Sequence, residues 1–224
     1  MTFSIAARCA DTGMFGVAVT SSSPAVAARC AFARAGVGAV ASQNVTDPRL
    51  GDQALDLMAL GASAPEAVAV LRATGAHMDH RQVLAVDAAG RTAVHTGPTA
   101  LGIFTEAKGE NAACGGNLLA NPDVPAAMLG AFAAATGPLG GRLLAALQGG
   151  LGAGGEAGPV RSAGLKMVRE VPWPVADLRV DWSEGCPIAD LQALWAIYEP
   201  QLEAYVTRAL NPQAAPSYGV PGDR

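Results

Sequence analysis

The sequence predicts an α+β fold in which layered sheets are sandwiched by helices. Short segments rich in β-forming residues come in pairs separated by turn signals, which is typical of hairpins. Pairs of helical segments alternate with them, in the order ββ, β, αα, ββ, αα, ββ, α. Half of the 224 residues are hydrophobic, yet only 5% are aromatic and 15% charged. Small aliphatic side chains of this kind suit closely packed layers.

Three strands are expected near the N-terminus. Residues 2–8 are apolar and rich in β-formers, a turn signal follows at residues 11–13, and residues 15–20 return as the second strand. The apolar run at residues 36–43 does not alternate with polar residues, which predicts a third strand buried on both faces. The polar segment at residues 44–48 is expected to be a loop.

Two helices are expected next. Residues 53–60 carry leucine and methionine at helical spacing and stop at Gly61. Ser63 is the expected N-cap of the following helix, because Glu66 completes a capping box three residues later and Pro65 suits the first turn.

The rest of the chain continues the alternation of strand pairs and helix pairs. A hairpin is expected at residues 81–87 and 91–96, followed by a strand or loop region through residue 104 and a turn at residues 115–117. Helices are expected at residues 124–135 and 139–147, with a flexible glycine-rich loop at residues 149–155. The last expected elements are strands at residues 162–170 and 175–182 and a helix at residues 187–210. We therefore expect a single domain over residues 1–210 and a proline-rich C-terminal tail over residues 211–224.

Charge and cysteine content argue against several classes of protein. The net charge is −4, and the Lys and Arg residues are scattered singly, so no nucleic-acid partner is expected. The four cysteines contain no CxxC pair, which predicts reduced thiols, and we expect no metal and no other cofactor. The N-terminus lacks the basic segment of a secretory signal, and no apolar stretch is long enough for a membrane span. These features predict a cytoplasmic protein without a membrane partner.

Thr2 is the residue that most suggests chemistry. Initiator methionine is normally removed when the next residue is small, and removal would leave a hydroxyl and a free α-amine on Thr2. An α-amine has a reference pKa of about 7.7–8.0, so it can act as a base near neutral pH. Threonine with its own N-terminal amine is a known nucleophile–base pair. Many proteins begin with Met-Thr, but here a strand is expected to start at Thr2, and a strand end can hold a nucleophile in place.

The chain resembles the DUF1028 family over essentially its whole length. The resemblance is carried by residues 2–8, 11–13, 16–19, 34–41, 43, 47–51, 95–97, 116–121, 162–165 and 216–223. It implies an N-terminal-nucleophile (Ntn) hydrolase with a four-layer αββα sandwich of mostly antiparallel sheets flanked by helices, which is also seen in proteasome subunits and glycosylasparaginase. The implied activity is hydrolysis of an amide bond by Thr2 at the head of the first strand.

Several other residues are candidates for the same site. The first hairpin returns at Ser21 and Ser22, whose hydroxyls could orient the Thr2 amine; the alternative is a serine-rich loop that bonds its own backbone. Gln43 and Asn44 end the third strand, where a side-chain amide could donate to an oxyanion, an interaction worth about 3 kcal/mol of barrier. The alternative for Gln43 and Asn44 is a loop-capping amide.

Three further side chains are candidates for substrate binding. Arg49 could bind a carboxylate through its guanidinium fork, unless it forms an ion pair with Asp47 or Asp52. His95 is expected to contact substrate or to be structural, because an N-terminal threonine needs no histidine base. Asn117, expected in a turn, could point its amide into the site.

The sequence therefore predicts an amidohydrolase that cleaves an amide bond in a small polar or amino-acid-derived substrate. Thr2 is the expected nucleophile after removal of Met1, and Gln43 or Asn44 the expected oxyanion donor. A homo-oligomer, specifically a dimer, is expected. The alternative function is a non-catalytic binding or assembly protein on the same fold.

Overall fold

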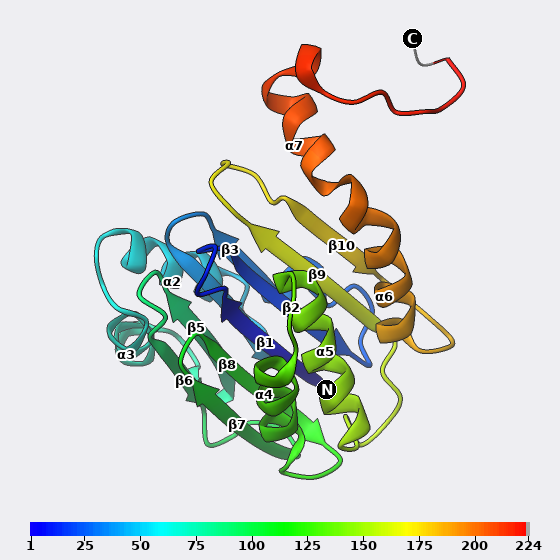
Figure 1. The fold of residues 1–224 in the computed structure, drawn as a ribbon. Coiled ribbons are helices and arrows are strands. Elements are labelled where there is room, and N and C mark those ends of the chain that lie inside the picture. Colours follow the sequence, from blue (N-terminus) through cyan, green and yellow to red (C-terminus); the bar gives the residue numbers. More distant parts are fainter. Residues whose placement is uncertain (223–224) are drawn as a thin grey trace.

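Two antiparallel sheets form the centre of the protein in the computed structural model, which describes residues 1–222 (Figure 1). The six-stranded sheet has the order β10-β9-β2-β1-β8-β7, with β10 (Ala176–Val180), β9 (Ser162–Val168), β2 (Phe15–Ser21), β1 (Thr2–Arg8), β8 (Ala112–Leu119) and β7 (Ile103–Gly109). The four-stranded sheet has the order β3-β4-β5-β6, with β3 (Ala31–Arg34), β4 (Gly38–Asn44), β5 (Arg81–Asp87) and β6 (Thr92–Thr96).

Helices cover the outer face of each sheet. The six-stranded sheet carries α4 (Val124–Ala134), α5 (Leu139–Gly152) and α6 (Pro187–Tyr198), and Figure 1 shows α4 lying over β8 and α5 lying over β1 and β2. The four-stranded sheet carries α2 (Arg49–Ala59) and α3 (Ala64–Thr74), while β1 packs directly against β4 and β5 between the sheets. The molecule is therefore the expected αββα sandwich, built from antiparallel sheets.

Strand β1 is buried on both faces because it lies in the middle of this sandwich. Phe3 and Ile5 belong to the cluster that packs under α4 and α5, whereas Ala6 belongs to the cluster between the two sheets. Since side chains alternate along a strand, Thr2 and Ser4 share the inner face with Ala6. Burial of Phe3 alone contributes about 2–3 kcal/mol relative to an exposed side chain, and it fixes the start of the strand.

The predicted N-terminus of α3 is confirmed in detail. The Ser63 Oγ atom accepts a hydrogen bond from the backbone amide of Glu66, and the Glu66 carboxylate accepts one from the backbone amide of Ser63 at 2.7 Å. Asp87 at the end of β5 accepts a further bond from the amide of Ala64 at 2.9 Å. The capping box and Asp87 together satisfy helix-end amides that have no partner within the helix.

The expected turn at residues 115–117 is wrong, because Gly115, Gly116 and Asn117 lie inside β8. The strand pairs with β7, and the hairpin turns instead at Glu110 and Asn111. Gly116 is required for packing rather than for a turn. A Cβ atom there would lie 2.6 Å from a methyl carbon of Leu119.

The expected glycine-rich loop at residues 149–155 is also wrong in its first half, because α5 continues to Gly152. A Cβ atom on Gly149 would lie 2.6 Å from the Cβ atom of Ala131 in α4, and one on Gly150 would lie 2.7 Å from Met128. These glycines let the two helices approach closely, which outweighs their low helix propensity.

Two further elements differ from the sequence-based expectation. Strand β3 (Ala31–Arg34) was not predicted; it pairs with β4 at the edge of the four-stranded sheet. The helix expected at residues 187–210 is interrupted at Pro200, which gives α6, a 3₁₀ turn and α7 (Leu202–Leu210). Proline has no amide hydrogen to donate, so the α-helical bonding pattern changes there.

The C-terminal segment leaves the sandwich. Figure 1 shows that α7 and the residues after it extend away from both sheets. The Arg208 guanidinium lies 3.7 Å from the ring centre of Tyr218 and donates to the carbonyl of Pro216, so the segment folds back on α7. Residues 223–224 of the expected tail lie outside the described residues. Within residues 1–222, none of the helices combines the length and apolar character needed to cross a bilayer.

Candidate active site

Thr2 is the first residue of β1, a central strand of the six-stranded sheet. It is paired with Asn117 on β8, and the next residue, Phe3, is paired with Thr20 on β2. The Thr2 side chain is buried, with 6% of its surface exposed. Ser21 follows Thr20 and lies on the same inner face as Val19, beside Thr2. The structure therefore brings together three of the predicted site residues: Thr2, Ser21 and Asn117.

Hydroxyl groups converge on the carbonyl of Met1. The Thr2 hydroxyl and the Ser21 hydroxyl both donate to that carbonyl oxygen, and their own oxygen atoms lie 3.3 Å apart. The amide of Ser23 donates to the Ser21 oxygen at 3.1 Å, which fixes the orientation of the Ser21 side chain. Met1 is half-buried and covers this pair of hydroxyls.

Glu156 is a buried acid beside this group that the sequence-based reasoning did not identify. It follows α5, and its backbone forms a β-bridge with Leu119 at the end of β8. Its side chain is 5% exposed, and its Oε2 atom accepts the amide hydrogen of Ser22 at 3.1 Å. Burial raises the pKa of the Glu156 carboxyl to about 7, and the nearby N-terminal ammonium opposes that rise. Its only sequence signal is an acidic residue in a run of glycine and alanine.

A chain of side-chain amides lies next to Thr2 between the two sheets. The Ser4 hydroxyl donates to Gln43 Oε1 at 2.6 Å, and Gln43 Nε2 donates to Gln82 Oε1 at 2.8 Å and to the carbonyl of Gly115 at 3.2 Å. Asn117 Nδ2 also donates to Gln82 Oε1, at 3.3 Å. Gln43 is fully buried and both hydrogens of its side-chain amide are engaged, so this side chain links the two sheets. Gln82, at the centre of this chain, was not predicted.

Asn44 and Ser22 lie at the ends of β4 and β2. Asn44 has a positive φ of 71°, and its Nδ2 atom donates to the carbonyl of His80 at 2.6 Å. Its Oδ1 atom accepts the amide hydrogen of Leu101, so both ends of the Asn44 amide hold loops in place. Ser22 contributes its backbone amide, which binds Glu156.

Arg49 forms the ion pair that the sequence left open as an alternative. Its Nε and Nη2 atoms donate to the two oxygens of Asp47 at 2.9 Å and 2.7 Å, while 76% of the side chain is exposed. The hydrogen bonds from the Arg49 side chain hold the pKa of Asp47 below its usual range. The guanidinium fork is therefore occupied by Asp47 rather than open to a carboxylate.

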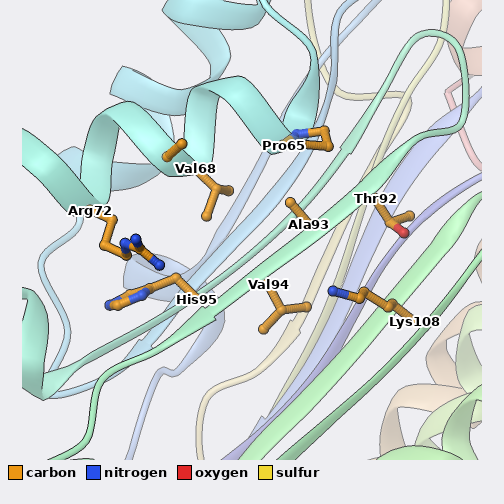
Figure 2. A pocket seen from close by; sticks show the side chains of 9 residues that line it. Pro65, Val68, Arg72, Thr92, Ala93, Val94, His95 and Lys108 are labelled. Carbon is orange, nitrogen blue, oxygen red and sulfur yellow. The ribbon is translucent and has the colours of Figure 1, made fainter.

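His95 lies on the other face of the four-stranded sheet from Thr2. It pairs with Val83, which belongs to the cluster under α2 and α3, so the His95 side chain points toward the helices. Figure 2 shows His95 lining a surface pocket of about 330 Å³ together with Arg72 and Lys108. Its Nε2 atom is 2.9 Å from the carbonyl of Met78. The structure does not bring His95 to the inner face that carries Thr2.

Across the described residues 1–222, no group of three or more His, Cys, Asp or Glu side chains is arranged to hold a metal ion. His80 lies three residues after His77, and its Nδ1 atom is 3.1 Å from the hydroxyl oxygen of Thr99.

Residues 2–191 match the DUF1028 family, which is described as a family of unknown function. The chain therefore belongs to the DUF1028 family. No curated protein matches it.

Two solved structures resemble the chain to different degrees. A crystal structure of a DUF1028 protein from Silicibacter pomeroyi is 28% identical, with 88% of each chain covered and a TM-score of 0.82. Anbu (ancestral beta-subunit) from Yersinia bercovieri is 12% identical, with 91% of this chain and 97% of that chain covered. Its TM-score is 0.38.

Proposed function

We propose that this protein is an Ntn amidohydrolase whose nucleophile is the hydroxyl of Thr2 after removal of Met1. The observation that carries the proposal is the convergence of the Thr2 and Ser21 hydroxyls on the Met1 carbonyl, at the end of a central strand. Removal of Met1 would free both hydroxyls at once and would leave the Thr2 amine on the same residue as the nucleophile.

The chemistry follows from that pair of groups. The Thr2 amine, with a reference pKa of about 7.7–8.0, takes the proton of the Thr2 hydroxyl as the oxygen attacks an amide carbonyl. The resulting ammonium returns the proton to the leaving nitrogen when the C–N bond breaks. Water then hydrolyses the ester that links the acyl group to Thr2, with the amine again acting as the base.

Ser21 is the donor that fits the oxyanion best. Its hydroxyl already donates to a carbonyl oxygen, that of Met1, beside the Thr2 hydroxyl. A substrate carbonyl bound in the space that Met1 leaves would receive the same hydrogen bond. Gln43 and Asn44 are the donors expected from the sequence. Both amide hydrogens of Gln43 and one of Asn44 are engaged with other groups.

The substrate class is a small polar or amino-acid-derived amide. The space that Met1 would leave is the size of one residue, and it is bordered by the backbone at Gly158, where a Cβ atom would lie 3.4 Å from Met1 Cε. A screen of small amides tests the proposal, with wild type, Thr2→Ala and Thr2→Ser compared. Thr2→Ser should retain turnover and Thr2→Ala should lose it. Equal turnover by Thr2→Ala and wild type would remove Thr2 from the chemistry.

The second candidate is a non-catalytic binding or assembly protein. It is favoured by apolar side chains exposed along the C-terminal segment that leaves the sandwich, among them Leu210 at 63%, Tyr218 at 56% and Val220 at 57%. Light scattering of the full chain and of a chain ending at residue 210 tests this role. A dimer that becomes a monomer on truncation, with no amide turnover in either form, would favour assembly over catalysis.

A further inference from the structure

Two buried acceptor atoms near Thr2 have no hydrogen-bond partner among the described residues 1–222. They are Asn117 Oδ1 and Glu156 Oε1, and each lies below the surface of the protein. Asn117 is 1% exposed and Glu156 is 5% exposed. Burial of an acceptor without a donor is unfavourable, and more so when the acceptor is charged.

The two acceptors lie on opposite sides of the start of β1. Asn117 is directly across from Thr2 on β8, and its Nδ2 atom is engaged with Gln82, which leaves Oδ1 as its open end. Glu156 is held on the other side through the amide of Ser22. The ammonium group of Met1 acts to lower the pKa of Glu156. This ammonium and the Glu156 carboxylate are therefore close enough to interact electrostatically.

We propose that Glu156 and Asn117 form the binding site of the Thr2 α-amine in the chain that has lost Met1. Removal of one residue creates a group with three N–H donors at the start of β1, where two acceptors lack donors. This inference rests on the proposed function for its role in hydrolysis. Glu156 acts there as a positioning residue: it holds the amine beside the Thr2 hydroxyl and does not touch the substrate.

The carboxylate also stabilises the charge that the reaction creates. When the Thr2 hydroxyl loses its proton to the amine, the O–H bond breaks, an N–H bond forms and the amine becomes an ammonium. A carboxylate and an amide oxygen beside it favour that charged form. The proton leaves with the departing nitrogen, so Glu156 neither gains nor loses a proton in the cycle. Within residues 1–222, the Glu156 carboxylate also interacts with the backbone amide and the side chain of Ser22, both of which are uncharged.

The test is the titration of the Thr2 amine in wild type and in Glu156→Gln. Methionine aminopeptidase treatment, followed by intact mass, yields chains that begin at Thr2. Trace acetylation at a series of pH values then gives the fraction of neutral amine, measured on the N-terminal peptide by mass spectrometry. Glu110→Gln is the matched control, because Glu110 is exposed in the turn at the other end of β8.

The midpoint of the Thr2 amine should be lower in Glu156→Gln by about one pH unit, and unchanged in Glu110→Gln. Equal midpoints in Glu156→Gln and wild type would overturn the proposed amine-binding site. Failure of the aminopeptidase to remove Met1 would overturn it as well. Amide turnover is measured on the same samples. A shifted midpoint without turnover in any sample would support the amine-binding site and overturn only the proposed hydrolase activity. Turnover with equal midpoints would support the hydrolase activity and overturn only the amine-binding site.

Discussion

The hydroxyl oxygens of Thr2 and Ser21 lie 3.3 Å apart on neighbouring strands of the six-stranded sheet, and both hydroxyls donate to the carbonyl of Met1. The backbone pairing of β1 with β2 and β8 fixes this spacing, because neither side chain has to reach out of its strand. A single processing step, the loss of Met1, would therefore expose a nucleophile and a hydrogen-bond donor together.

Ser21→Ala should lower kcat for amide hydrolysis about 100-fold and change KM little. The lost hydrogen bond is the one proposed to form to the oxyanion, which exists in the transition state and not in the bound substrate. Steady-state kinetics on the best substrate from the amide screen measure the effect.

Ser23→Ala is the matched control for that prediction. Ser23 contacts Ser21 through its backbone amide, which the substitution keeps. Its kcat should stay close to that of wild type. If Ser21→Ala and Ser23→Ala were equally active, Ser21 would have no part in the reaction.

Asp87→Asn should lower the free energy of unfolding by about 2–4 kcal/mol at pH 7. Asp87 is buried, and its two oxygens accept hydrogen bonds from the backbone amides of Ala64, Ala89 and Arg91 and from the Arg91 side chain. Burial acts to raise the pKa of Asp87, but these bonds outweigh it and lower the pKa. Urea unfolding measures the difference, and Asp79→Asn, at an exposed position, should change stability by less than about 0.5 kcal/mol.

The same carboxylate predicts a direction for the effect of acid. A depressed pKa means that the stabilisation is fully present above the unfolded-state value of about 3.9 and is lost as the pH falls through the lower, folded-state value. The stability difference between wild type and Asp87→Asn should therefore shrink below about pH 4. A difference that stays constant down to pH 2 would contradict the role given to the Asp87 charge.

Two glycines of α5 should respond to alanine in opposite directions. Gly149→Ala should destabilise the protein by about 1–3 kcal/mol, because its Cβ atom would lie 2.6 Å from that of Ala131. Gly141→Ala meets no atom within 4 Å and should stabilise the protein by about 0.5–1 kcal/mol through helix propensity. Thermal unfolding of both variants measures the two changes in stability relative to wild type. Equal shifts of the same sign would show that α4 and α5 are not closely packed at Gly149.

The layer architecture could be predicted from the sequence because its signals are local. The side chains of residues 2–7 alternate between two buried environments and are all uncharged, so the strand and its burial follow from the pattern. The capping box at Ser63 and Glu66 is equally local, and the structure reproduces it. Thr2 and Ser21 meet because a short hairpin returns its second strand to the start of the first.

Features that depend on contacts between distant segments could not be predicted in this way. Gly116 and Gly149 carry the same sequence signal as turn or loop glycines, and only the neighbouring Leu119 and Ala131 side chains explain them. Glu156 lies 154 positions after Thr2 along the chain, so no spacing rule connects the two.

Intact-mass spectrometry of the protein, purified from a host with active methionine aminopeptidase, tests the central claim most directly. We expect the chain to begin at Thr2, with the mass of Met1 missing, because only then does Thr2 carry a free amine. Met1 retained on all of the protein would contradict it, since an amine bound in a peptide cannot act as the base for the Thr2 hydroxyl.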